Sequence, residues 1–153
     1  MHHFQTTQDL PVSLDQAWDF FSDPANLIVL THPKMDVWME SENGLTPIFP
    51  GKILKIRIKL FGYIPSSFLS EITEVKAPHY FIDTQLKGPF GYWQHKHLLT
   101  TIDGGTRVTD DVKFKFPMGP LGVLAYNIFG KQYLKGIFDY RHMFLEKKFG
   151  KFK

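Results

Sequence analysis

Residues 121–149 carry the longest regular pattern of apolar and polar positions in the chain. Apolar side chains recur there at spacings of three and four, which is the pattern of one face of an α-helix. They form two adjoining rows, namely Tyr126, Phe129, Tyr133, Ile137, Tyr140 and Phe144, and Leu134, Phe138, Leu145 and Phe149. Polar residues fill the opposite stripe at Lys131, Lys135, Asp139, His142 and Glu146. The pattern predicts one long amphipathic helix that ends at Gly150.

Residues 52–61 alternate between apolar and charged side chains, which is the pattern of a strand with one wet face. The apolar set is Leu54, Ile56, Ile58 and Leu60, and the charged set is Lys55, Arg57 and Lys59. Weaker alternation and turn signals predict further strands at residues 4–10, 37–40, 68–75, 80–86, 92–102 and 107–116. The sequence thus predicts an antiparallel sheet of six or seven strands.

Two short helices are predicted after the first strand, at residues 13–21 and about 25–30. Ser13 and Gln16 form a capping box, in which each side chain bonds to the backbone amide of the other residue. Asp23 followed by Pro24 is typical of a second helix start. Hairpin-connected strands with one long helix at the end indicate an α+β fold.

Residues 103–106 read Asp-Gly-Gly-Thr and predict a tight hairpin, because both glycines tolerate positive φ. With the two glycines as the turn residues, His95 faces Phe114 and His97 faces Val112. One surface of the hairpin is then mostly apolar and is the covered face. Its side chains are Trp93, His95, His97, Leu99, Val108, Asp110, Val112, Phe114 and Phe116.

The preceding strand adds a second aspartate to this face. A five-residue loop at 87–91 places Asp83 opposite His95 and Phe81 opposite His97. Buried ionisable groups cost roughly several kcal/mol unless they are paired. We therefore expect an Asp83–His95 pair and a diagonal His97–Asp110 pair.

The cluster of two histidines and two aspartates has four interpretations. It is a structural hydrogen-bond network, the polar end of a ligand pocket, an acid–base catalytic group or a metal site. His95 and His97 share one strand face, as the histidines of cupin metal sites do. Cupins also need a carboxylate four or five residues further on, where this chain has Thr101 and Ile102. The cupin interpretation fails on that point, and we expect no metal.

Composition narrows the class of protein. At 153 residues we expect residues 1–153 to form a single domain, and fifteen Phe supply more ring surface than a minimal core needs. The chain has no Cys, which excludes disulfides, thiolate metal sites and a cysteine nucleophile. The mild net charge of +3 predicts no nucleic-acid partner. No phosphate-binding glycine loop, G-x-S-x-G or H-E-x-x-H motif occurs, and no cofactor is expected.

Residues 1–9 are polar and lack the apolar core of a signal peptide. No apolar run approaches the roughly 20 residues of a membrane span. We therefore expect a cytoplasmic protein without stable membrane insertion. The oligomeric state is left open.

Several strings in the sequence are shared with one large superfamily. They are Phe81-x-Asp83-x-Gln85, Gly88-Pro89-Phe90, Trp93-x-His95-x-His97, Gly105-Thr106, Asp110-x-Val112, Pro117-x-Gly119-Pro120-Leu121-Gly122 and Phe138-x-Tyr140-Arg141. The opening at residues 11–20 also looks like the first helix of that superfamily. On these strings the chain resembles the START-related SRPBCC superfamily of polyketide cyclase-like and birch-pollen-allergen-like proteins. The likeness is greatest to an uncharacterised bacterial ligand-binding subgroup.

The resemblance implies the helix-grip fold, a strongly curved antiparallel sheet that wraps around the long C-terminal helix. It also implies a deep cavity between helix and sheet that receives apolar ligands such as lipids, sterols, isoprenoids or polyketides. Carriers, sensors and some enzymes share this scaffold, so the resemblance names no ligand and no catalytic residue.

Three hypotheses follow for the function. The first is binding of an apolar small molecule, of lipid, isoprenoid or polyketide type. Its predicted walls are Trp93, Phe114, Tyr126, Tyr133 and Ile137, and its polar end is Asp83, His95, His97 and Asp110. Arg141 and Lys135 are expected to lie too far round the helix to reach the ligand.

The second hypothesis is an enzyme of the cyclase or dehydratase kind, in which His97, oriented by Asp110, transfers protons. The third is a solid interior that only presents a surface. A cavity of about 300 Å³ or more would favour the first two hypotheses.

Overall fold

The computed structural model describes residues 1–40 and 46–153. Within these ranges seven strands form one antiparallel sheet in the order β1-β7-β6-β5-β4-β3-β2. The strands are β1 (His2–Leu10), β2 (Trp38–Met39), β3 (Ile53–Leu60), β4 (Ile64–Lys76), β5 (Tyr80–Lys87), β6 (Tyr92–Ile102) and β7 (Gly105–Lys115). The helical elements are α1 (Leu14–Phe21), α2 (Pro24–Val29), the 3₁₀ helix η1 (Pro33–Met35), α3 (Gly119–Ala125), the π-helical turn η3 (Tyr126–Gly130) and α4 (Lys131–Phe149).

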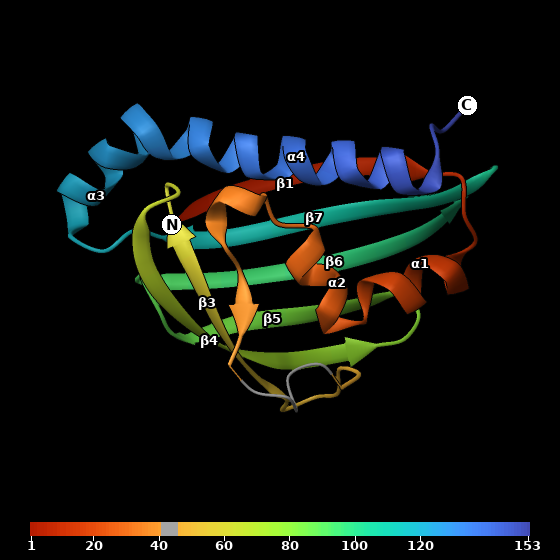
Figure 1. Ribbon diagram of the computed structural model, residues 1–153, viewed down its shortest axis with the longest axis horizontal. Helices are drawn as coiled ribbons and strands as arrows, with labels where there is room; N and C mark the ends of the chain where they lie inside the picture. Colours follow the sequence, from red (N-terminus) through yellow and green to blue (C-terminus); the bar gives the residue numbers. More distant parts are fainter. Residues whose placement is uncertain (41–45) are drawn as a thin grey trace.

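Figure 1 shows the strands turning steadily from β1 to β3, so that the sheet curves around one side. Helix α4 lies along that side, and α1 and α2 cover the part of the sheet beside it. The predicted α+β class, the seven strands and the helix-grip arrangement are confirmed. No helix in the two described ranges is long and apolar enough to cross a membrane.

The two short helices begin where their capping residues predict. The Ser13 hydroxyl accepts from the Gln16 amide at 3.2 Å, and the Gln16 side chain accepts from the Ser13 amide at 3.0 Å. Asp23 accepts from the amide of Ala25 at 3.0 Å, directly after which the chain is helical. These local bonds set the residues at which α1 and α2 begin. Phe21, the last residue of α1, is fully buried.

The C-terminal helix differs from the single regular helix that its sequence pattern predicts. The π-helical turn η3 separates α3 from α4, and α3 extends past the end of the sheet (Figure 1). A π-turn holds more residues than an α-turn, so it rotates the face before it relative to the face after it. Phe129, predicted to point inward, is 66% exposed as a result. The buried row of α4 is Leu134, Phe138, Arg141 and Leu145.

The β6–β7 hairpin has a register two residues away from the predicted one. The observed pairs include Ile102–Gly105, His97–Asp110, His95–Val112 and Trp93–Phe114. Gly104 alone of the two glycines has positive φ, at +83°, and Gly105 already belongs to β7. A shift of two residues keeps every side chain on its face. The predicted covered face is therefore right, although the predicted partners across it are wrong.

The register between β5 and β6 is the predicted one. Asp83 lies opposite His95, and Phe81 lies opposite His97. Both histidines and Asp110 are buried, with exposed fractions of 8%, 3% and 2%. The three strands β5, β6 and β7 therefore bring all four ionisable residues of the predicted cluster together.

The apolar core consists of two clusters with the histidines between them. The larger cluster includes Phe81, whose ring stacks on His97 with a centroid distance of 4.2 Å. The smaller cluster includes Phe138 of α4, whose ring meets His95 edge-on at 5.9 Å. The two histidines are thus flanked by aromatic rings of both clusters.

Strand β1 passes very close to Gly105. A Cβ atom at Gly105 would lie 2.0 Å from the carbonyl oxygen of Leu10. Because both partners belong to the backbone, only a shift of the backbone could relieve this clash. We expect Gly105→Ala to lower the free energy of unfolding by about 1–3 kcal/mol, the usual cost of overpacking. The measurement is urea-induced unfolding followed by circular dichroism.

Gly136→Ala is the matched control. Gly136 lies in α4 with no atom within 4 Å of its would-be Cβ. Alanine there should stabilise the protein by roughly 0.5–1 kcal/mol through its helix propensity. Equal stability of Gly105→Ala and the wild type would contradict the close approach of β1.

Candidate functional site

A cavity of about 230 Å³ lies between α4 and the curved sheet. The inward row of β3 forms one wall, with Leu54, Ile56, Ile58 and Leu60, as the alternation in the sequence predicts. The cavity volume is smaller than the roughly 300 Å³ at which pockets for drug-sized ligands begin. The interior is therefore hollow, but it has room only for a small ligand or for one end of a longer one.

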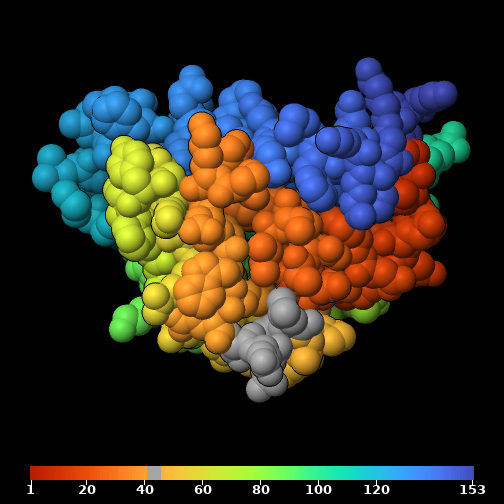
Figure 2. Space-filling model, viewed as in Figure 1, coloured from red at the N-terminus to blue at the C-terminus, as the bar shows by residue number. Residues whose placement is uncertain are grey.

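Two ring contacts join α4 to the elements that border the cavity. Phe61, in the turn between β3 and β4, packs on Tyr133 with tilted rings and a centroid distance of 4.3 Å, and its amide donates to the Tyr133 hydroxyl at 3.0 Å. His32, just before η1, contacts Tyr140 at 4.8 Å. In Figure 2 these segments, yellow-green, orange and blue, meet on the face that is shown. These contacts join α4 to the β3–β4 turn and to the start of η1.

Seven of the nine residues predicted for the site line the cavity. They are Asp83, Trp93, His95, His97, Phe114, Tyr133 and Ile137. Asp110 is buried next to the cavity but does not line it. Tyr126 packs elsewhere, on His2, Phe114 and Phe116 at centroid distances of 4.1, 5.3 and 5.6 Å.

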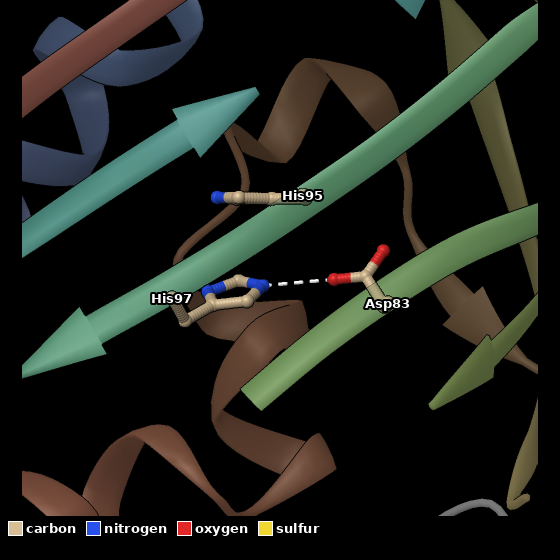
Figure 3. A group of neighbouring side chains, drawn as sticks. All are labelled: Asp83, His95 and His97. Carbon is tan, nitrogen blue, oxygen red and sulfur yellow. Dashed lines mark hydrogen bonds and ion pairs between the residues drawn. The ribbon is translucent and has the colours of Figure 1, made fainter. Parts of the chain in front are cut away.

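Each aspartate of the cluster bonds to the histidine that lies diagonally across the strand pair. His97 Nε2 lies 2.8 Å from Asp83 Oδ2, and Figure 3 shows the imidazole edge pointing at that carboxylate. His95 Nε2 lies 2.8 Å from Asp110 Oδ1. The predicted Asp83–His95 pair is therefore wrong, and the predicted His97–Asp110 pair is present only as a longer ion-pair contact, with His97 Nδ1 3.6 Å from Asp110 Oδ1. In a twisted sheet the diagonal neighbour is within reach of a long side chain, and these side chains use it.

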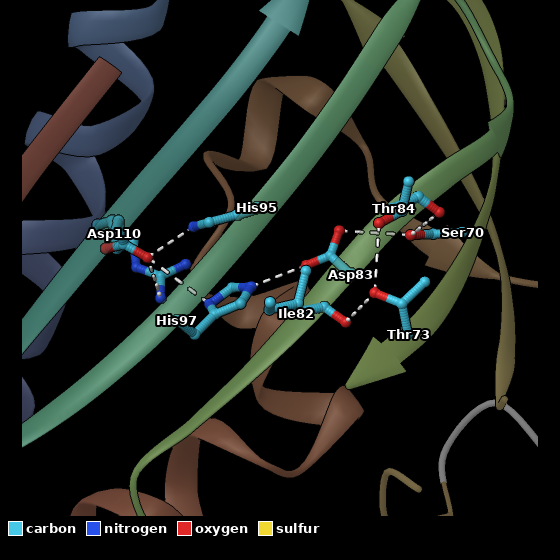
Figure 4. Close-up of polar contacts among 9 residues, drawn as sticks. Ser70, Thr73, Ile82, Asp83, Thr84, His95, His97 and Asp110 are labelled. Atoms are coloured by element: carbon cyan, nitrogen blue, oxygen red, sulfur yellow. Dashed lines mark hydrogen bonds and ion pairs between the residues drawn. The ribbon is translucent and has the colours of Figure 1, made fainter. Parts of the chain in front are cut away.

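The Asp83–His97 pair is held in one protonation state. Ser70 donates to Asp83 at 3.3 Å, which adds a second hydrogen bond to the carboxylate (Figure 4). Burial by itself would raise the pKa of Asp83, but the hydrogen bond from His97 and the bond from Ser70 lower it. Burial, reinforced by the adjacent His95, lowers the pKa of His97 to about 4. At neutral pH the pair therefore consists of a carboxylate and a neutral imidazole.

The second aspartate is tied to the C-terminal helix. Arg141 Nη2 lies 3.1 Å from Asp110 Oδ1, and the guanidinium also sits over the Phe21 ring at 5.4 Å. Burial would raise the pKa of Asp110, but the charge of Arg141 and the hydrogen bond from His95 bring it far below its usual range. Asp110 therefore stays ionised and links α4 to β6 and β7.

Arg141 lines the cavity and is 7% exposed, so the expectation that it lies too far round the helix is wrong. The sequence contained the signal, because Arg141 follows Phe138 by three residues and precedes Leu145 by four. It belongs to the buried row, and its charge concealed that. Lys135, in contrast, is exposed and pairs with Asp139 at 2.6 Å.

The ligand atoms of Asp83, His95 and His97 lie within 4.8 Å of one another, close enough for a metal ion to be considered. The two imidazole rings are stacked, however, with centroids 3.7 Å apart and planes 27° apart. The nitrogen lone pairs lie in the ring planes, and the two Nε2 atoms bond to carboxylates on opposite sides, that of His95 to Asp110 and that of His97 to Asp83 (Figure 4). One ion at about 2.1 Å from both nitrogens would require the rings to turn. The hydrogen-bonded pairs fit the observed geometry better, and the lack of a metal stays a prediction.

Residues 10–149 match the model of a protein family described as "Domain of unknown function (DUF8410)". No protein with a curated description matches the chain. The family model covers every element from the end of β1 to the end of α4.

Solved structures of the same fold cover nearly the whole chain. A START superfamily protein from Mycobacterium smegmatis has a TM-score of 0.69 at 13% identity, over 96% of this chain and 99% of that one. Ara h 8.0201 has a TM-score of 0.64 at 21% identity, over 95% and 98%. A protein from Rhizobium leguminosarum has a TM-score of 0.70 at 13% identity, over 95% of each chain. At these identities the likeness shows the fold alone, and that fold is the helix-grip arrangement implied by the resemblance in the sequence.

The low pKa of His97 predicts how stability depends on pH. Below pH 6.5 the unfolded chain takes up a proton on this residue that the folded protein does not bind. The free energy of unfolding should therefore fall by about 3 kcal/mol between pH 6.5 and pH 4, and this contribution should level off below pH 4. Urea unfolding at a series of pH values measures the slope.

In His97→Gln this contribution disappears, so its stability should change less with pH in that window than the stability of the wild type. His79→Gln, in an exposed turn, is the control and should keep the wild-type slope. The comparison uses slopes rather than absolute stabilities, because His97→Gln also changes the bond to Asp83. A parallel pH profile for His97→Gln and the wild type would show that the imidazole is not held neutral.

Proposed function

The chain belongs to the family described as domain of unknown function DUF8410, and we propose that it binds an apolar small molecule between α4 and the sheet. The proposed ligand is of lipid, isoprenoid or polyketide type. Residues 1–153 act in this proposal as one START-like ligand-binding domain. The observation that carries it is an apolar cavity with a small set of convergent polar groups at one side.

The apolar character of the lining supports this proposal. Most of the residues around the cavity are aliphatic or aromatic, and each methylene that a ligand buries against them contributes roughly 0.8 kcal/mol.

The shape of the lining favours an apolar body with one polar end. Aliphatic side chains from β3, α2 and η1 form the larger part, including Leu27, Met35 and Ile56. The charged and imidazole side chains come from β5, β6 and α4. A ligand oriented with its apolar part toward β3 would avoid burying unpaired polar groups.

The enzymatic alternative, a cyclase or dehydratase that uses His97 and Asp110, has less support. His97 is oriented by Asp83 rather than by Asp110. Its pKa of about 4 makes it a weak base at neutral pH, whereas general bases work best with a pKa near the working pH.

The absence of a nucleic-acid partner and the cytoplasmic location stay predictions.

The proposal is tested by filling the cavity from the β3 side. Ile56 lines the cavity, and Ile56→Trp should place the indole in the space meant for the ligand. We expect this variant to bind the neutral fluorescent dye N-phenyl-1-naphthylamine at least about tenfold more weakly than the wild type, a loss of roughly 1.4 kcal/mol. Fluorescence titration gives both dissociation constants.

Ile53→Trp is the matched control, because Ile53 is 44% exposed and lies in the same strand without lining the cavity. Its dye affinity should equal that of the wild type. Mass spectrometry of the native protein should also detect a co-purified small molecule in the wild type but not in Ile56→Trp. Unchanged dye binding by Ile56→Trp would place the dye elsewhere and remove the support for this cavity.

A further inference from the structure

Two buried polar side chains that line the cavity have atoms without a hydrogen-bond partner. His97 Nδ1 and the Nε and Nη2 atoms of Arg141 make no hydrogen bond within residues 1–40 and 46–153. Arg141 Nη2 and His97 Nδ1 do lie in ion-pair contact with Asp110 Oδ1, at 3.1 and 3.6 Å, but Arg141 Nε has no such contact. The residues are 3% and 7% exposed. Unpaired polar atoms at such depth cost roughly 1–3 kcal/mol each, so a group that satisfies them is expected.

The unpaired nitrogen of His97 is a hydrogen-bond acceptor. A carboxylate only accepts, so the short contact to Asp83 requires the proton of the imidazole on Nε2. The neutral ring then has a lone pair on Nδ1. This protonation state is the one that burial favours, since it lowers the pKa of His97.

The unpaired atoms of Arg141 are donors, because a guanidinium has no acceptor. Arg141 Nη2 and His97 Nδ1 lie 3.1 and 3.6 Å from the same oxygen, Asp110 Oδ1. They are therefore near neighbours, and both side chains reach the cavity while Asp110 stays behind them. In Figure 4 the dashed lines from Asp110 mark this meeting point of β6, β7 and α4.

The donors of Arg141 beside the acceptor His97 Nδ1 favour some polar groups of a ligand over others. A hydroxyl accepts one hydrogen bond and donates another, so it satisfies both sides at once. An ether oxygen or a carboxylate satisfies Arg141 alone, and an ammonium group satisfies His97 alone. A carboxylate would also add a third negative charge beside Asp83 and Asp110, against the single cation of Arg141.

We propose that the bound ligand is an aliphatic or cyclic alcohol, whose hydroxyl accepts from Arg141 and donates to His97 Nδ1. This inference rests on the binding function proposed above and adds the chemistry of the buried end of the ligand. Figure 4 shows that the pairs around the meeting point are already made, so the hydroxyl would complete the network without breaking it.

The test compares four ligands of equal chain length on the unmodified protein. Octan-1-ol, its methyl ether, octanoate and octylammonium share one apolar chain and differ in the polar group. Displacement of N-phenyl-1-naphthylamine at pH 7.5 gives their affinities. We expect the alcohol to bind about 3- to 10-fold more tightly than the ether, the gain of one added hydrogen bond. Octanoate and octylammonium should bind more weakly than the alcohol.

The outcomes separate the two proposals. Equal affinity for alcohol and ether, or tightest binding of either ion, would overturn the hydroxyl inference and leave the binding function intact. Failure of all four compounds, together with failure of the dye to bind, would contradict the binding function itself and the inference with it.

Variants of α4 add a check from the side of the protein. Arg141→Met keeps the length of the side chain but removes the donors, and it should weaken octan-1-ol binding about 3- to 10-fold. Lys135→Met removes an exposed cation from the same helix and should leave the affinity unchanged. If circular dichroism shows that Arg141→Met does not fold, the comparison of the four ligands on the wild type decides alone.

Discussion

The structure depends on one constraint, the need to pair four ionisable side chains inside an otherwise apolar interior. Asp83, His95, His97 and Asp110 come from three adjacent strands, and each bonds across to a neighbouring strand. Such groups would destabilise the core if any one of them lost its partner. The registers β5–β6 and β6–β7 must therefore both be kept, and the two-residue turn at Gly104 is what sets the second one.

Arg141 extends the same constraint from the sheet to the helix. Its ion pair with Asp110 holds α4 at a fixed position along β7, while Phe138 and Leu145 on either side of it pack into the two apolar clusters. The long helix is thus positioned by one polar contact between apolar ones. This arrangement explains how α4 can span a cavity without collapsing into it, because its position does not depend on filling the space.

Much of the fold follows from the sequence alone, for identifiable reasons. The capping residues Ser13 and Asp23 act locally, and the alternation in β3 reports directly which side of the strand is covered. The covered face of the β6–β7 hairpin was also predictable, because a register error of two residues does not change it. The exact partners of His95 and His97 were not, since they depend on the turn geometry and on the twist of three strands. The inward position of Arg141 was missed although it fits the spacing of the buried row in α4, because a charged side chain is normally assigned to the surface.

The two sides of the cavity differ in how strongly their side chains depend on one another, and this affects which substitutions the protein tolerates during evolution. The β3 wall consists of separate aliphatic side chains such as Leu54 and Ile58, each of which can be exchanged for a larger or smaller one with little effect on the others. On the opposite side, hydrogen bonds and ion pairs join Asp83, His95, His97, Asp110 and Arg141. Substitution of one of these residues leaves others without a partner. Variation among descendants of this chain should therefore accumulate on the β3 wall, where it alters the length or bulk of the accepted molecule, while the chemistry that is recognised at its head stays the same.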